Sequence, residues 1–378
     1  MKSFKSLFSL DPAVCYFNAA YFAPQLLALS KIGTEQLERA KQPWNLHASD
    51  MFEPCENLRA EAGKLMGTSP ENIALIPAVS YGAETAAKNI RLRKNGELLL
   101  PAGEFPSHVY PWLAAAEESG AIVRFVSRES GASWAESFEA QIGPATQVVC
   151  VSPCDWSNGR SFGLAQLSRT VRKFGARLVL DLSQSLGAAS LDLNDIKPDF
   201  AYSVGYKWQL GPYGLSYMYV SADFLNGRPI ENNWINRRHS EDFSRLTEYR
   251  REYQPGARRF DSGQHSSLIL NHMALGALTF INELGVEKIN THIRRLNLRL
   301  MSGLGELGFE VPAISETLGH MFGAKPPMGF SASALGAALS EQKVFVSSRG
   351  ENLRFSPHIY NDDADVTRAL SAVRSIIS

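Results

Sequence analysis

The chain has 378 residues, of which 44% are hydrophobic and 20% are charged, a composition that excludes a disordered protein. Its length suits one large domain with a smaller second one. Lys plus Arg and Asp plus Glu both total 38, so there is no global field to attract nucleic acid or an anionic membrane.

Targeting and metal-binding signals are absent from this sequence. Residues 1–12 contain too short an apolar stretch for a signal peptide, and no apolar run reaches the 18 residues of a membrane span. We therefore expect a cytoplasmic protein, of a size usual for an enzyme, with no membrane or nucleic-acid partner. The four cysteines, Cys15, Cys55, Cys150 and Cys154, form no Cys-x-x-Cys pair. The one close pair, Cys150 and Cys154, has no further His or Cys nearby to complete a metal set, so we predict reduced, mostly buried thiols and no metal site.

The chain begins with an apolar and aromatic segment, residues 13–24, centred on Asn18-Ala19-Ala20. Apolar residues at helical spacing then predict helices over 25–40 and 56–66.

The next stretch predicts the first strand and its following helix. Residues 73–76 are predicted as a strand and 82–90 as an alanine-rich helix, with Ser80 as its cap. A helix N-terminus presents unpaired N–H groups and the positive end of its dipole, so it suits a phosphate. Ser80 is also simply a common N-cap residue, and both interpretations stay open here.

An aromatic loop follows the predicted strand at 97–100. It carries Phe105, His108, Tyr110 and Trp112. An aromatic ring beyond a strand end can stack on a flat cofactor or pack beneath its own loop, and the residues do not decide between these roles.

Strands and helices continue to alternate to about residue 220. Strands are predicted over 122–126 and 148–151, and helices over 112–118, 133–141 and 164–174. This alternation is typical of a doubly wound, mostly parallel α/β sheet. Neither a Gly-x-Gly-x-x-Gly after a strand nor a Gly-x-x-x-x-Gly-Lys-Ser/Thr occurs, which disfavours a dinucleotide-binding fold and a nucleotide triphosphatase.

Two further apolar runs end beside charged residues. Residues 178–180 lead into Asp181, and residues 200–204 lead into Lys207. Short runs without alternation suit strands buried on both faces of a parallel sheet. Ligands bind beyond the carboxyl ends of such strands, so the carboxylate and the amine are candidates for one site. A salt bridge or a solvated loop lysine is the alternative.

The character of the chain changes after residue 220. Residues 226–265 are polar and predicted to be irregular. From about residue 305, we predict a small α/β unit. The predicted helices are 267–284, 286–304, 332–339 and 363–377, and the strands 309–311, 344–347 and 353–356. We expect a large domain over 16–255 and a small domain made of 1–15 and 256–378.

The motifs DLSQSLG and SVGYKWQLGPYG resemble those of fold-type I pyridoxal-phosphate enzymes of the class V aminotransferase group. The group includes cysteine desulfurases, kynureninases and isopenicillin N epimerase-like proteins, and the resemblance covers nearly the whole chain. It implies that Lys207 carries pyridoxal 5'-phosphate (PLP) as a Schiff base. It also implies that Asp181 faces the pyridine nitrogen and that Gln184 hydrogen-bonds the phenolic oxygen of the cofactor.

The resemblance extends to other cofactor contacts. IPAVSYG resembles the phosphate-binding turn, which implies contacts from Val79 and Ser80. GEFPSHVYPW resembles the segment that stacks on the ring, and Phe105 holds that place. Tyr206 resembles the phosphate ligand of kynureninases. Ser203 lies one place away from the serine of the desulfurases.

Two further segments resemble parts that line or share the site. Asn158, or Trp156 beside it, is expected to line the site near the ring or substrate. The stretch 262–267, which includes Gln264, resembles a loop that relatives contribute to the phosphate site of the neighbouring subunit. This resemblance implies a homodimer with shared active sites.

An arginine near the C-terminus is implied to bind the α-carboxylate of the substrate. VSSRGENLRFSPHIYN resembles the segment that holds this arginine in the group, and Arg354 matches its place best, followed by Arg349. A planar guanidinium suits a carboxylate. We also place Asn18 among the substrate-binding residues.

The reaction is less well specified than the cofactor. No cysteine occurs after Cys154, which disfavours the persulfide chemistry of cysteine desulfurases. Transamination, elimination by a kynureninase-like or C–S lyase route, and epimerisation stay open. We predict a class V aminotransferase-like enzyme that acts on an α-amino acid. A catalytically inactive binding protein is the alternative from another class, and the presence together of Asp181, Gln184 and Lys207 argues against it.

Overall fold

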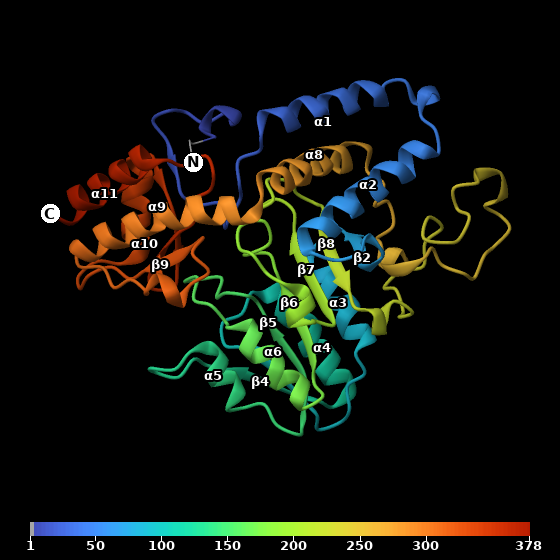
Figure 1. The fold of residues 1–378 in the computed structure, drawn as a ribbon, viewed down its shortest axis with the longest axis horizontal. Helices are drawn as coiled ribbons and strands as arrows, with labels where there is room; N and C mark the ends of the chain where they lie inside the picture. Colours follow the sequence, from blue (N-terminus) through green and yellow to red (C-terminus); the bar gives the residue numbers. More distant parts are fainter. Residues whose placement is uncertain (1–3) are drawn as a thin grey trace.

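A seven-stranded sheet forms the centre of the computed structural model, which describes residues 4–378 (Figure 1). Its strand order is β2-β8-β7-β6-β5-β3-β4. The strands are β2 (Ile73–Ile76), β3 (Glu97–Pro101), β4 (Ile122–Val126), β5 (Thr146–Val151), β6 (Arg177–Asp181), β7 (Phe200–Val204) and β8 (Ser216–Val220). Only β8 runs antiparallel to its neighbours, so the predicted doubly wound, mostly parallel sheet is confirmed.

Helices cover both faces of this sheet, as its short apolar strands require. One face packs against α2 (Ser49–Met66), α5 (Trp134–Glu139), α6 (Leu164–Lys173), α7 (Leu193–Ile196) and α8 (Leu268–Leu284). The other face packs against α3 (Val79–Asn89) and α4 (Pro106–Ser119). Helix α1 (Leu27–Ala40) lies along α8.

A smaller α/β unit lies beside the sheet (Figure 1). Its antiparallel sheet has the order β11-β12-β9. Its elements are α9 (Val286–Glu306), β9 (Phe322–Ala324), α10 (Ala332–Glu341), β11 (Ser347–Arg349), β12 (Asn352–Phe355) and α11 (Asp363–Ile377). The N-terminal segment joins it, because β1 (Cys15–Tyr16) pairs with β10 (Val344–Phe345), and Cys15 and Phe17 enter its apolar core.

The division of the chain at residue 256 stays a prediction. Helix α8 follows that position and contributes Ala274 and Leu278 to the core beneath the large sheet.

Several predicted elements differ from the structure. The strand predicted at 309–311 is wrong, because only a single bridge joins Glu310 to Lys325. The helix predicted at 112–118 begins at Pro106, since a proline at the first helical position lacks only an N–H that would be unpaired anyway. Strand β8 was not predicted separately. Helix α2 begins at Ser49, about two turns before the start predicted at residue 56.

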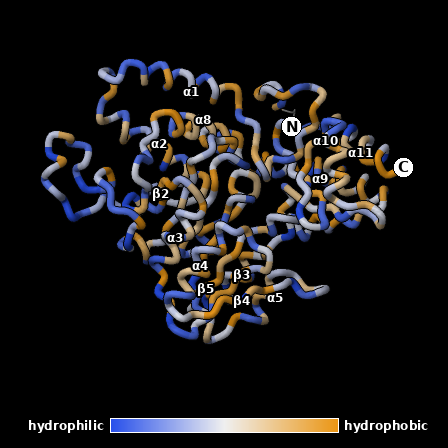
Figure 2. The backbone as a smooth tube through the Cα atoms, turned by 180° about the vertical axis from the view of Figure 1, so that it is seen from behind, coloured by the Kyte–Doolittle hydropathy of each residue, from blue (hydrophilic) through white to orange (hydrophobic). Residues whose placement is uncertain are grey.

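The polar segment 226–265 is irregular, as predicted, with short 3-10 turns such as Phe243–Arg245 and Gly256–Phe260. It extends away from the sheet in Figure 1, and Figure 2 shows that it is largely hydrophilic, whereas the strands are apolar.

The prediction of buried thiols is confirmed, because all four cysteines are buried and free. Among residues 4–378, no helix combines the length and apolarity needed to cross a membrane.

Candidate active site

A cavity of about 230 Å³ opens at the carboxyl ends of the central strands. We call it the strand-end cavity. The turns after β2, β3, β5, β6 and β7 all meet there, because parallel strands end at the same edge of a sheet. Its lining residues are Pro77, Ala78, Val79, Ser80, Glu104, Phe105, Ser107, Ser152, Trp156, Asp181, Ser183, Gln184, Val204, Tyr206, Lys207, Tyr213, Gly214 and Ser216.

Lys207 lies in this cavity, three residues beyond the end of β7. Its side chain is 9% exposed, and no hydrogen bond or ion pair of its amine occurs within residues 4–378. The amine lies 5.7 Å from the centre of the Phe105 ring and 5.9 Å from that of Tyr206. Burial lowers the pKa of Lys207 to about 8, and the positive charges of Arg354 and Arg349 act in the same direction, against the opposing effect of Asp181.

Asp181 ends β6 and is buried beside a neutral histidine. Its Oδ1 accepts a 2.8 Å hydrogen bond from the N–H of Ser183, and its Oδ2 lies 3.9 Å from Nδ1 of His108. Burial lowers the pKa of His108 to about 4 although Asp181 opposes this, so the imidazole is neutral at pH 7. The structure therefore brings Asp181 and Lys207 to one cavity, and no salt bridge between them is recorded.

A second carboxyl group, that of Glu104, lies in the same cavity, although it was not predicted from the sequence as a site residue. Its Oε1 accepts the N–H of Phe105 at 2.7 Å, and Oε2 accepts the Ser152 hydroxyl at 3.3 Å. Burial and the charges of Asp181 and Asp155 together raise the pKa of Glu104 to about 8, against the opposing effect of the hydrogen bonds from Phe105 and Ser152. The only signal in the sequence was its place directly before Phe105.

Helix α3 begins at the cavity wall. Its N-cap is Ala78, so the prediction that Ser80 caps the helix is wrong. Val79 and Ser80 occupy its first turn instead and line the cavity. The first N–H groups of a helix have no partner within it, so this turn offers donors to an anion, as the phosphate prediction requires.

The aromatic segment after β3 divides between the cavity and the core. Phe105, the N-cap residue of α4, is 41% exposed and lines the cavity. The other three aromatic residues lie in helix α4 and not in the predicted loop. His108 and Trp112 are buried there, and Tyr110 is exposed to solvent. Trp156 meets Phe105 edge-on, with 5.7 Å between ring centres, and donates its indole N–H to the carbonyl of Gly103 at 2.8 Å.

Tyr206 and Gln184 complete the group of predicted residues that reach the cavity. The Tyr206 ring packs against Phe22 and Tyr213, with ring centres 5.1 and 4.7 Å apart. Burial raises the pKa of its hydroxyl. Gln184 donates through Nε2 to the carbonyl of Ala20 at 3.1 Å.

Six predicted residues do not line the strand-end cavity: Ser203, Asn158, Asn18, Gln264, Arg349 and Arg354. Ser203 is buried in β7 and accepts a 2.9 Å hydrogen bond from Gln209. Asn158 bonds within its own turn, to Asp155 at 2.9 Å. Asn18 accepts the hydroxyl of Ser347 at 2.6 Å, and Gln264 is exposed with a φ of 60°.

The two predicted arginines lie on adjacent strands of the small sheet, β11 and β12, and both contact Trp156. Arg354 donates to the carbonyl of Trp156 at 2.6 Å, and the Arg349 guanidinium lies 5.8 Å from the centre of the Trp156 ring. Arg354 is buried, and its Nε has no hydrogen-bond partner within residues 4–378. Burial lowers the pKa of Arg354, and the charge of Arg349 adds to this effect. An anionic ligand beside the two arginines would offset the burial of the Arg354 charge and its repulsion by Arg349.

The residues of the cavity fit PLP by their chemistry. The unpaired, partly deprotonated amine of Lys207 suits an aldehyde carbon. Phe105 offers an open ring face, the start of α3 suits a phosphate, and Asp181 suits a protonated ring nitrogen.

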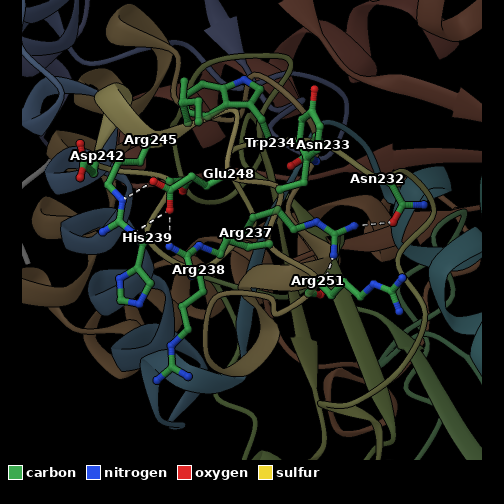
Figure 3. A pocket seen from close by; sticks show the side chains of 14 residues that line it. Asn232, Asn233, Trp234, Arg237, Arg238, His239, Asp242, Arg245, Glu248 and Arg251 are labelled. Atoms are coloured by element: carbon green, nitrogen blue, oxygen red, sulfur yellow. Dashed lines mark hydrogen bonds and ion pairs between the residues drawn. The ribbon is translucent and has the colours of Figure 1, made fainter.

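A second cavity, of about 380 Å³, lies in the irregular segment and is lined by residues 232–251 (Figure 3). We call it the arginine-rich cavity. Arg245 and Arg250 both bond to Glu248, at 2.6 and 2.9 Å. Arg237 bonds to the carbonyl of Arg251 and to Asn232, at 2.8 and 2.9 Å. Two of its arginines are therefore paired with one glutamate at the surface.

Comparison with known proteins gives one family and several distant relatives. The model of the family described as aminotransferase class-V matches residues 43–369. Isopenicillin N epimerase of Amycolatopsis lactamdurans is 25% identical over 97% of this chain and 96% of its own. An uncharacterized aminotransferase of Bacillus subtilis, YcbU, is 23% identical over 86% of this chain and 84% of its own. A probable cysteine desulfurase of Methanothermobacter thermautotrophicus is 25% identical over 73% and 69%.

Solved structures share the fold. A lysine-to-alanine variant of C-DES with glycine covalently linked to the PLP cofactor superposes with a TM-score of 0.90, at 19% identity, over 98% of this chain and 99% of its own. The apo cysteine desulfurase of Thermococcus onnurineus NA1 superposes with a TM-score of 0.83, at 18% identity, over 100% and 98%.

Proposed function

Because the chain belongs to the class V aminotransferase family, whose cofactor is PLP, we propose that it acts at the α-carbon of an amino acid through a Schiff base on Lys207. The observation that carries this proposal is the place of Lys207. It is buried at the end of β7, has no partner for its amine within residues 4–378, and shares the strand-end cavity with Asp181.

The other residues of the cavity support the same assignment. PLP, when bound, withdraws electrons from the α-carbon of an attached amino acid, provided that its ring nitrogen stays protonated. Asp181 would hold that proton, Phe105 would stack on the ring, and Val79 and Ser80 would bind the phosphate. Gln184 and Tyr206 line the wall near Lys207.

Lys207 is suited to move the α-proton. A general base works best when its pKa lies near the working pH, and burial lowers the pKa of Lys207 to about 8. A larger share of the displaced amine would therefore be unprotonated, and so able to take the proton and return it, than at the ordinary pKa of 10.5.

We assign the substrate carboxylate to Arg354, with Arg349 as its neighbour. An anion at this place would neutralise a buried guanidinium whose Nε is otherwise unpaired within residues 4–378. Asn18, although it does not line the cavity, belongs to the same small-domain junction through its hydrogen bond to Ser347.

Persulfide chemistry is disfavoured by the thiols themselves. Cys154 lies nearest in sequence to the cavity, yet it is buried, and burial raises its pKa far above the ordinary value. A nucleophilic cysteine needs the opposite environment. We therefore propose an aminotransferase-like reaction, with elimination and epimerisation as the outcomes that the product assay below distinguishes.

We also propose a homodimer in which Gln264 reaches the partner's phosphate site. Gln264 is exposed and has a left-handed φ of 60°. Sedimentation of the holoprotein measures the assembly directly.

The Schiff base is tested by reduction with borohydride and peptide mass spectrometry. We expect the reduced cofactor on Lys207, and we expect Lys207→Ala to abolish both this adduct and turnover. Lys31→Ala, at an exposed lysine of α1, is the matched control and should behave as the wild type. A turnover of Lys207→Ala equal to that of the wild type would refute the proposal.

A panel of amino acids then identifies the reaction. Accumulation of pyridoxamine phosphate with an oxo acid indicates transamination. Release of pyruvate, ammonia or alanine without pyridoxamine phosphate indicates a lyase, and loss of optical purity alone indicates an epimerase.

A further inference from the structure

Trp208, the residue after Lys207, is buried where three parts of the chain meet. Its apolar surroundings include Ala19 and Ala20 of the N-terminal segment, Ala188 of the large sheet region, and Met321 of the small unit. The strand-end cavity is not lined by Trp208, so any effect on the site must pass through another residue.

That residue is Gln184. The indole N–H of Trp208 donates to Oε1 of Gln184 at 3.2 Å, while Nε2 of Gln184 donates to the carbonyl of Ala20 at 3.1 Å. An indole N–H can only donate and a carbonyl can only accept, so the two partners allow one orientation of the amide. One N–H of Gln184 is left over, and the side chain lines the cavity.

Two histidines hold the Trp208 ring. His320 meets it edge-on with 4.7 Å between ring centres, and His358 stacks on it at 5.8 Å. Nδ1 of His358 accepts the N–H of Ile359, so its other nitrogen donates to the Trp208 carbonyl at 3.0 Å. Nε2 of His320 bonds to the main-chain carbonyl of Gln184.

Both histidines are uncharged at neutral pH. Burial lowers the pKa of each to about 4. Neither imidazole therefore changes its charge near neutral pH. The hydrogen bond from Trp208 to Gln184 is not altered by their titration in this range.

We propose that Trp208 is a positioning residue, which locks the Gln184 amide as a hydrogen-bond donor toward the phenolic oxygen of the cofactor. The inference rests on the proposed function, because that function places Gln184 beside this oxygen. Without the indole N–H, only the Ala20 carbonyl holds the amide, which can then swing on that one bond and withdraw its remaining N–H from the phenolic oxygen.

The consequence is a change in proton affinity at the Schiff base. A donor to the phenolate oxygen shares its negative charge and so weakens its attraction for the proton on the neighbouring imine nitrogen. Loss of the donor strengthens that attraction, so the imine keeps its proton to higher pH.

The test is a pH titration of the visible absorption band of the holoenzyme carrying Trp208→Phe. We expect the midpoint to rise by about one pH unit, the size of a hydrogen bond to a charged group. Gln184→Leu should raise it by at least as much, and adding Trp208→Phe to Gln184→Leu should raise it no further.

Trp134→Phe is the matched control. Trp134 is also a buried tryptophan, but it packs against Phe138 and Phe162, away from the site, and its indole N–H has no partner within residues 4–378. Its titration should equal that of the wild type. If Trp208→Phe does not fold, 3-benzothienylalanine at position 208 keeps the ring shape without the N–H and carries the same test.

The possible failures are distinguishable. A wild-type midpoint in Trp208→Phe, together with a shifted midpoint in Gln184→Leu, would overturn the positioning role and leave the proposed function intact. Absence of a borohydride-reducible adduct on wild-type Lys207 would instead overturn the proposed function itself.

Discussion

Two cavities in this protein differ in how they hold charged groups. In the strand-end cavity, Lys207 and Glu104 are buried and form no ion pair within residues 4–378, and burial moves the pKa of each to about 8. In the arginine-rich cavity, Arg245 and Arg250 share Glu248 at the surface (Figure 3). The strand-end cavity is the smaller, about 230 Å³ against about 380 Å³.

The difference supports our proposal that the strand-end cavity is the reactive site. Paired, solvated charges gain little free energy and keep their ordinary protonation. Buried groups without a partner are poised to change protonation, which acid–base chemistry requires. Between these two cavities, size alone would favour the arginine-rich one.

The largest expected effect concerns Asp181. We predict that Asp181→Asn, which keeps the shape and an oxygen to accept the N–H of Ser183 but loses the charge, lowers kcat by about 10² to 10³-fold. Steady-state kinetics on the holoenzyme measure this. Asp242→Asn, in the arginine-rich cavity, is the control and should leave kcat unchanged. An unaltered kcat in Asp181→Asn would show that the two cavities do not differ in this way.

Glu104 should make the apoprotein lose stability as pH rises. Its pKa is about 8 when folded against an ordinary 4.5, so between these values the folded state binds more protons and the free energy of unfolding falls. Each tenfold step in acidity is worth about 1.4 kcal/mol, so the upper bound is about 5 kcal/mol. Denaturant titrations from pH 4.5 to 8 should show this decline, and Glu104→Gln should flatten it. An equal decline in both proteins would contradict the assignment.

Lys207 should act in the opposite direction at higher pH. Its pKa is about 8 when folded against an ordinary 10.5, so between these values the unfolded state binds more protons and stability rises with pH. We predict that Lys207→Met stabilises the apoprotein at pH 7 by up to about 3 kcal/mol, a gain that disappears near pH 10.5. Arg245→Met, at an exposed ion pair, should leave the unfolding midpoint unchanged. A loss of stability in Lys207→Met at pH 7 would refute this prediction.

Much of the fold follows from local patterns. Apolar runs at 73–76 and 200–204 coincide with β2 and β7, because a strand buried on both faces needs apolar residues throughout. The run at 122–126 coincides with β4, although this edge strand is largely exposed. The missed β8 is also buried, but it closely follows the motif SVGYKWQLGPYG, whose turn residues hide the start of the strand. The false strand at 309–311 failed because one bridge to Lys325 is its only pairing, and pairing is not a local property.

The site divides in the same way. Asp181, Gln184, Phe105 and Lys207 could be proposed from the sequence because each follows a strand end directly or belongs to a contiguous motif. Glu104 and His108 could not, since their chemistry arises from burial. Only the folded chain brings His108 to within 3.9 Å of Asp181.

By itself the sequence determined the succession of most strands and helices along the chain, the family resemblance, and the residues at the strand ends. These features depend on neighbouring residues and on short motifs. The tertiary structure alone decided which groups are buried without partners and which distant groups meet. Trp208 reaches Gln184 across 24 residues, and Arg354 reaches Trp156 across 198. The first contact joins two turns of the large sheet and the second joins the small unit to the turn after β5, and the packing that produces both depends on the whole chain at once.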